Sequence, residues 1–171
     1  PLTRPYHVVR PPPWRRTVPD AEVVLTRHLD HPPADVFAWC TDPTLLALWL
    51  GPKGFSACDV ESDVRVGGRF AFRMQGEDGV YAAEGVYREL TPPTKVVLTW
   101  RWTEGPAGEE PDGVESLLTY EIRAEGKGTL LTLIHQGLLD ETTADSHTEG
   151  WSEALDKLVR AIAQSTTRRA N

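Results

Sequence analysis

The sequence predicts an α+β domain in which one curved antiparallel sheet of six to seven strands wraps around a long C-terminal helix. Three observations support this fold class. Strand-like segments separated by turn residues fill the middle of the chain, one long amphipathic segment follows them, and several strands alternate apolar and polar residues. A one-sided sheet and a single helix bury both apolar faces at once when the sheet curves around the helix.

The predicted elements follow in order. A first strand at Glu22–Leu29 ends before a pair of prolines. Two short helices are expected next, at Pro33–Cys40 and from Asp42 to Leu50, with Asp42 as the cap and proline at the first helical position. Glycine- and proline-rich turns then separate six further strands: Phe55–Glu61, Gly67–Gln75, Val80–Leu90, Lys95–Trp102, Val114–Ala124 and Gly128–His135.

The C-terminal helix has the clearest pattern. The sequence Ser146-His147-Thr148-Glu149 fits a capping box, which predicts that the helix begins there. Its apolar stripe consists of Trp151, Leu155, Leu158, Val159 and Ile162. Gly150 disfavours helix by about 1 kcal/mol relative to alanine, so we expect it to permit close approach of a neighbouring backbone. A frayed basic tail is expected at Thr166–Asn171.

Composition restricts the function classes. The chain has 171 residues, the size of one domain, and a net charge of -7, which argues against a nucleic-acid or anionic-lipid binder. No apolar run reaches the ~18–20 residues that span a bilayer, and Pro1–Asp20 lacks the apolar core of a signal peptide. We expect a cytoplasmic protein without membrane insertion, with Cys40 and Cys58 reduced.

Residues 1–20 differ from the rest of the chain. They contain six prolines, and four arginines against Asp20 give them a charge of +3. Proline excludes helix and interior strand, so the segment is predicted to be an extended arm that precedes a domain at residues 21–165. The arm is either a leader lying against the acidic domain or a recognition peptide.

The strand alternation predicts which side chains face the helix. The inward set from four strands includes Phe70, Phe72, Met74, Trp100, Trp102, Leu118, Tyr120, Leu133 and His135. For Val80–Leu90 both faces are mixed, and no assignment is made. The aromatic rings of the inward set are more than one slim helix normally covers. They either fill a core or leave an apolar cavity for a small molecule.

Several motifs carry a family resemblance over Val23–Ile162. They are Val36-Phe37, Asp42-Pro43, Trp49, Asp63-Val64-Arg65-Val66-Gly67-Gly68, Glu89-Leu90-Thr91-Pro92-Pro93, Leu98-Thr99-Trp100, Leu131-Thr132-Leu133, His135, His147 and Gly150-Trp151. In this order the chain resembles the START-like helix-grip (SRPBCC) superfamily, and within it the branch of the activator of heat-shock-protein-90 ATPase. The resemblance implies a hydrophobic cavity between sheet and helix. Members bind lipids, polyketides or other apolar molecules, some act as cyclases or hydrolases, and some resemble the calicheamicin self-resistance protein.

The resemblance also implies site residues. Trp49 is expected at the lip of the cavity, Trp100 with Phe70 and Phe72 on its wall, and Trp151 on the helix. The full expected ligand-binding set is Trp49, Phe70, Phe72, Met74, Trp100, Trp102, Leu118, Tyr120, Leu133, His135, Trp151 and Leu155.

The sequence contains few candidate catalytic residues. His135, His147, Tyr120 and Glu84 could supply acid or base groups, although an inward histidine also serves to hold a loop by hydrogen bonds. No nucleophile elbow or phosphate loop is present, and we expect no metal and no cofactor. The connection Thr103–Gly113 is either a mobile flap or an insertion.

The sequence therefore favours a binding protein without obligatory catalysis. Its expected ligand is a planar, aromatic or polyketide-like apolar molecule, held for transport, sequestration or self-resistance, by a monomer or weak homodimer. One alternative is a cyclase or hydrolase that acts on such a ligand. Another is a co-chaperone-like interaction module, which would have a collapsed cavity and an exposed apolar patch.

Overall fold

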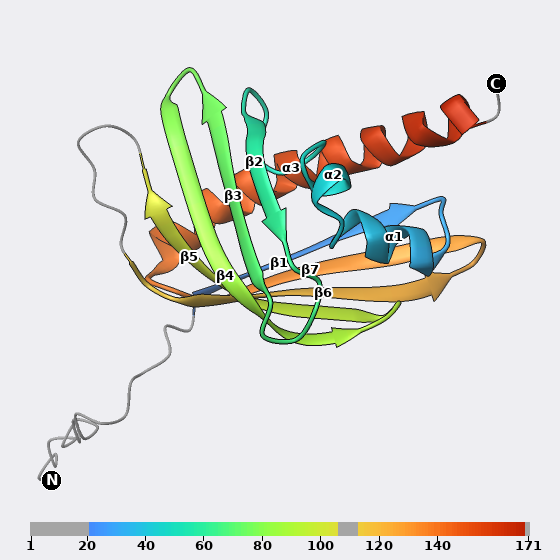
Figure 1. Ribbon diagram of the computed structural model, residues 1–171, viewed down its shortest axis with the longest axis horizontal. Helices are drawn as coiled ribbons and strands as arrows, with labels where there is room; N and C mark the ends of the chain where they lie inside the picture. Colours follow the sequence, from blue (N-terminus) through green and yellow to red (C-terminus); the bar gives the residue numbers. More distant parts are fainter. Residues whose placement is uncertain (1–20, 106–112, 170–171) are drawn as a thin grey trace, which may run out of the picture.

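The computed structural model describes residues 21–105 and 113–169, and it confirms the predicted fold class. A seven-stranded antiparallel sheet curves around one long helix (Figure 1). The elements are β1 (Ala21–Leu29), α1 (Pro33–Trp39), α2 (Pro43–Leu46), β2 (Ser56–Ser62), β3 (Arg69–Gly76), β4 (Gly79–Thr91), β5 (Lys95–Glu104), β6 (Ser116–Glu125), β7 (Gly128–Leu138) and α3 (Glu141–Arg169). The arm at residues 1–20 and residues 106–112 of the predicted flap lie outside the described residues.

The strands lie in the order β1-β7-β6-β5-β4-β3-β2. From β2 to β7 each strand pairs with the next along the chain, and β1 then pairs with β7. Because β1 and β2 are on opposite edges, α1 and α2 carry the chain from one edge to the other. Figure 1 shows α1 on the side of β6 and β7, far from the tip of the β3–β4 hairpin.

The pairing of β4 with β5 is irregular at two places. It shifts register between Ala82 and Ala83 and again between Tyr87 and Glu89. At Gly85, between the two shifts, a side-chain Cβ would lie 1.7 Å from the carbonyl oxygen of Thr99. Only glycine permits this close approach, so the contact between the two strands depends on the absence of a side chain at residue 85.

Helix α3 is longer than predicted at both ends. It begins at Glu141, because Asp140 rather than Ser146 caps it: the Asp140 carboxylate accepts a hydrogen bond from the Thr143 amide at 2.8 Å. Hydrogen bonds from the Thr143 amide and hydroxyl hold the pKa of the Asp140 carboxyl below its ordinary value. The capping-box prediction at Ser146 is wrong. The helix also continues to Arg169, through most of the predicted tail, because no glycine or proline ends it earlier.

The second short helix is shorter than predicted. It ends at Leu46 instead of Leu50, and residues 47–50 continue as turns before the positive-φ Gly51. Asp42 caps it as predicted, since its carboxylate accepts the amides of Thr44 and Leu45.

The predicted inward face of the sheet is buried against α3 and the short helices. The predicted inward residues of β3, β5, β6 and β7 are buried, apart from the half-buried Trp102. On β4 the structure settles the open assignment, with Ala83 and Tyr87 turned inward. The outer face carries cross-strand ion pairs, among them Glu84 with Arg69 and Arg101, which lower the pKa of Glu84.

The structure also bears on the expectations about the two cysteines and about membrane insertion. Cys40 is buried and Cys58 lies exposed on the edge strand β2, so the two cysteines are not joined. No helix in the described residues is long and apolar enough to cross a membrane.

Candidate functional site

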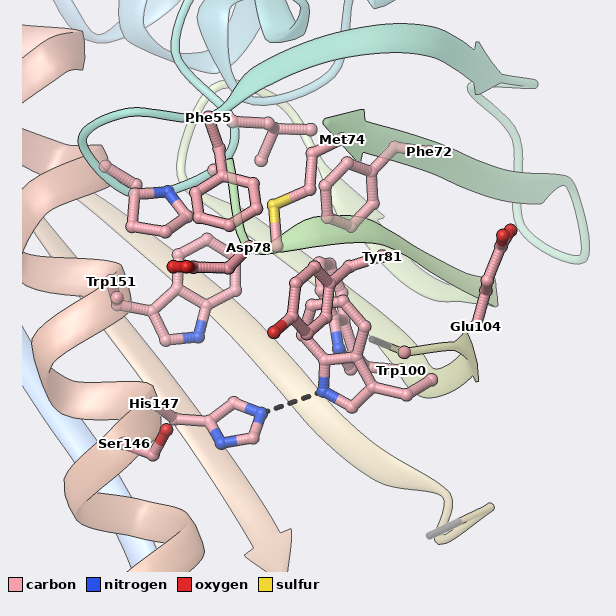
Figure 2. Close-up of a pocket in the computed structure, with 17 residues that line it drawn as sticks. Phe55, Phe72, Met74, Asp78, Tyr81, Trp100, Glu104, Ser146, His147 and Trp151 are labelled. Carbon is pink, nitrogen blue, oxygen red and sulfur yellow. Dashed lines mark hydrogen bonds between the residues drawn. The ribbon is translucent and has the colours of Figure 1, made fainter. Parts of the chain in front are cut away.

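A cavity of about 400 Å³ lies between the sheet and the N-terminal half of α3 (Figure 2). Its wall comes from loop 51–55, from the ends of β3, β4 and β5, and from α3. The lining residues are Leu50, Gly51, Pro52, Phe55, Phe72, Met74, Asp78, Tyr81, Trp100, Trp102, Glu104, Gly105, Ser146, His147, Gly150, Trp151 and Ala154.

Aromatic rings dominate this wall. Trp100 is at the centre, with ring centroids 5.2 Å from Phe72 and 5.3 Å from Trp151. Tyr81 extends the group outward, since its ring meets those of Phe55 and Trp102 edge to face at 5.5 and 6.1 Å. Edge-to-face packing leaves ring faces turned in several directions, which suits a flat apolar ligand.

Regular geometry places these side chains. Phe72 and Met74 alternate along β3, and Trp100 and Trp102 alternate along β5, so each pair faces the same side of the sheet. On α3 the lining residues Ser146, His147, Gly150, Trp151 and Ala154 recur at three- and four-residue spacing, which keeps them on one face of the helix.

His135 lies behind the cavity and is fully buried. Its Nδ1 accepts a hydrogen bond from the Trp151 indole at 3.0 Å, so in the neutral ring Nε2 carries the proton and donates to Ser116 Oγ at 2.7 Å. The Ser116 hydroxyl donates in turn to the Trp100 carbonyl oxygen. Burial, together with the neighbouring His147, lowers the pKa of His135 to about 3. His135 is therefore a neutral structural acceptor.

His147 repeats this arrangement at the cavity wall. Its Nε2 accepts the indole N–H of Trp102 at 3.0 Å, drawn in Figure 2, and its Nδ1 donates to the Thr143 carbonyl oxygen at 2.7 Å. The His135 and His147 rings lie 5.1 Å apart. Each histidine thus fixes the orientation of one cavity tryptophan.

Trp100 differs from the other two cavity tryptophans. Its side chain is 1% exposed, and its indole Nε1 is buried without a hydrogen-bond partner among the described residues. A buried donor left unpaired costs about 1–3 kcal/mol. The ring of Trp100 therefore borders the cavity while its donor stays buried and unsatisfied among the described residues.

Helix α3 holds the loop 51–55 in place. The Lys157 ammonium donates to the carbonyl oxygens of Gly51 and Phe55, each at 3.0 Å, and Glu153 accepts the amide of Lys53 at 2.8 Å. Partial burial lowers the pKa of Lys157. On the other side, a Cβ on Gly76 would lie 2.8 Å from the Phe55 ring. The loop is fixed between the helix and the β3–β4 hairpin.

Five predicted ligand-binding residues line the cavity: Phe72, Met74, Trp100, Trp102 and Trp151. The other seven, Trp49, Phe70, Leu118, Tyr120, Leu133, His135 and Leu155, are buried outside it. The expectation that Trp49 forms the lip is wrong, because the residue is fully buried and does not line the cavity. Its side chain is 0% exposed and its indole donates to the Trp39 carbonyl oxygen at 3.0 Å.

The candidate catalytic groups do not converge. Among them only His147 lines the cavity. Tyr120 packs against Trp49 at 6.3 Å, and burial raises its pKa well above the ordinary value. Glu84 lies on the outer face of the sheet between two arginines. In the described residues no three of His, Cys, Asp and Glu are grouped to hold a metal ion.

Sequence reasoning missed several lining residues. Phe55 and Asp78 lie in turns, and Tyr81 lies on the strand whose two faces were both mixed. Gly150 was singled out, but its expected role is wrong: a Cβ there would have nothing within 4 Å. A glycine in the middle of a helix, one residue before a buried tryptophan, was the available signal for open space beside the helix.

Comparison with known proteins agrees with this architecture. The model of the family described as Activator of Hsp90 ATPase homolog 1-like protein matches residues 30–163. The AHSA1 protein of Silicibacter pomeroyi is 28% identical, with a TM-score of 0.75, over 85% of this chain and 99% of its own. A Chromobacterium violaceum protein is 28% identical, with a TM-score of 0.73, over 83% and 96%.

CalU16 from Micromonospora echinospora is also similar. It is 27% identical, with a TM-score of 0.62, over 86% of this chain and 79% of its own. A search of curated protein sequences found no match. The family model covers most of the chain, and the chain therefore belongs to the Activator of Hsp90 ATPase homolog 1-like family.

Proposed function

We propose that this protein binds an apolar, aromatic small molecule between its sheet and α3, and holds it reversibly as a carrier or sequestering protein. The observation that carries the proposal is the cavity of about 400 Å³ walled by aromatic rings. Small-molecule sites commonly measure about 300–1,000 Å³ and combine apolar walls with a few polar groups. A ligand that covers these rings removes apolar surface from water, which favours binding.

One detail of the wall supports a ligand rather than a packing defect. Gly150 leaves the space beside α3 open, although alanine there would favour the helix by about 1 kcal/mol. This glycine weakens the helix of the protein alone and keeps room for a ligand beside Trp151.

Binding without chemistry fits the polar groups better than catalysis does. His147 already uses Nδ1 and Nε2 in hydrogen bonds to Thr143 and Trp102, and His135 is buried. A general acid or base has to reach the reacting atom, and these groups are committed to structure. The interaction-module alternative predicted a collapsed cavity, and the open volume argues against it.

A cavity-filling substitution tests the proposal. The probe is 9-anthracenemethanol, a neutral flat fluorophore, titrated into the protein while quenching of tryptophan emission is recorded. Gly150→Leu places a butyl group in the open space beside Trp151 and is expected to weaken binding at least tenfold.

Gly150→Ala is the matched control. It adds one methyl group, should leave binding nearly unchanged and should raise the free energy of unfolding by about 1 kcal/mol. If wild type does not bind the probe, or Gly150→Leu binds it as wild type does, the cavity is not the binding site.

A further inference from the structure

The charged residues that line the cavity are acidic. Asp78 and Glu104 are both part of the wall, and no lysine or arginine is among the described lining residues. The whole chain carries a net charge of -7. A ligand anion would approach two carboxylates without a compensating cation, whereas a ligand cation would be attracted.

The two carboxylates are not equivalent. Glu104 is bound by Arg73, whose Nη2 lies 3.0 and 2.8 Å from its two carboxylate oxygens. Asp78, at the tip of the β3–β4 hairpin, is exposed and forms no hydrogen bond or ion pair with any residue that the structure describes. Figure 2 shows the two carboxylates at opposite sides of the cavity. The negative charge of Asp78 is therefore not paired with a described residue, and it can form an ion pair with a cationic ligand.

Aromatic rings share the cavity wall with Asp78. Tyr81 follows it on β4, and its ring meets Phe55 and Trp102 edge to face. The faces of such rings carry partial negative charge and attract cations within about 6 Å. A carboxylate beside a row of aromatic rings recognises a positive charge attached to an apolar body.

The basic groups near the cavity have other partners. Arg73 is paired with Glu104, and the Lys157 ammonium binds the carbonyl oxygens of Gly51 and Phe55. Lys53 is exposed and does not line the cavity. None of these three cations forms an ion pair with Asp78.

We propose that the ligand is a lipophilic cation, an aromatic molecule carrying a protonated amine that binds beside Asp78 while its ring system enters the cavity. This inference rests on the proposed function and names the ligand class for the same site. The amine stays at the exposed margin and keeps part of its hydration, which avoids the cost of burying a charge.

Three probes of one size test the charge preference. They are 9-(aminomethyl)anthracene, a cation at neutral pH, the neutral 9-anthracenemethanol, and anionic 9-anthracenecarboxylate. With wild-type protein we expect the cation to bind about fivefold more tightly than the alcohol, and the anion more weakly than either. Added salt should reduce the preference of the cation over the alcohol.

Asp78→Asn should lower the ratio of cation to alcohol affinity to about twofold or less, and this ratio cancels any effect of the substitution that both probes share. Glu77→Gln is the matched control, since Glu77 is exposed on the same hairpin but does not line the cavity, and it should keep the full preference. Near-ultraviolet circular dichroism checks that both variants fold.

The outcomes separate the two proposals. If the alcohol binds but the cation gains nothing, or if Asp78→Asn keeps the preference, the lipophilic-cation inference is wrong and the cavity remains a binding site. If none of the three probes binds, both proposals are overturned.

Discussion

The two halves of the interior are built on the same sheet face and differ in what covers them. In one half, Trp49 is fully buried, its ring packs against Tyr120, and its indole N–H is bound to the Trp39 carbonyl oxygen at the end of α1. In the other half, Trp100 is equally buried, but it borders an open cavity and its N–H has no partner among the described residues.

This difference lies in the packing around each ring and not in hydrophobicity. Both tryptophans belong to one hydrophobic core cluster. Trp49 belongs to the segment with α1 and α2, whereas α3 and loop 51–55 line the cavity beside Trp100 among the described residues. A ligand can complete the open half, whereas the closed half is already complete.

The strongest test of this comparison is Trp49→Ala. Removing a fully buried ring from the closed half should lower the free energy of unfolding by about 3–5 kcal/mol, because no solvent or ligand can fill the space and the Trp39 carbonyl loses its donor. Urea denaturation measures the change. Trp102→Ala, in the open half, should cost less than half as much and should instead weaken binding of 9-anthracenemethanol. Equal stability losses would contradict the division.

Acidification should destabilise the folded chain through His135, which is buried behind the open half. The pKa of His135 is about 3 in the folded chain and about 6.5 when unfolded, so below pH 6.5 the unfolded state binds a proton that the folded state does not. Stability is then complete above about pH 6.5 and falls by up to about 1.4 kcal/mol per unit as the pH drops, or about 2 kcal/mol at pH 5.

The His135→Gln variant isolates this effect, since it removes the titrating ring. Denaturation curves of wild type and variant at several pH values give the difference in slope. An identical pH dependence in the two proteins would show that His135 is already protonated or exposed in the folded state.

The smallest effect is expected on the outer face of β5, one residue from Trp100. Arg101 pairs with Glu84 on the exposed side of the sheet, and exposed ion pairs contribute about 0.2–1 kcal/mol. Arg101→Gln should therefore change the unfolding free energy by less than about 1 kcal/mol and leave probe affinity unchanged. A large loss of binding would mean that the outer face also shapes the cavity.

The fold was predictable because strand alternation and one amphipathic helix leave few ways to bury their apolar faces. The inward set on β3, including Phe72 and Met74, followed from period-two alternation alone. The start of α3 was misplaced because the capping box at Ser146 and the Asp140 cap six residues earlier are both good local signals, and the chain uses Asp140.

The site was less predictable, because burial does not reveal whether space remains beside a side chain. Tyr120 on β6 and Phe72 on β3 are both buried on the inward face of the sheet, but of the two only Phe72 borders the cavity. Phe55 and Asp78 reach the wall from turns, where no periodicity indicates direction. Their positions depend on contacts between segments far apart in the sequence.

The fixed loop 51–55 has a consequence for how a bound ligand changes the motions of the cavity wall. Lys157 and Glu153 join the loop to α3, and Phe55 packs it against the β3–β4 hairpin. Three parts of the wall are therefore mechanically connected, and a ligand that restrains one of them restrains the others. Amide hydrogens in the hairpin should exchange more slowly in the complex even where the ligand does not touch them, and Lys157→Met should abolish this distant protection.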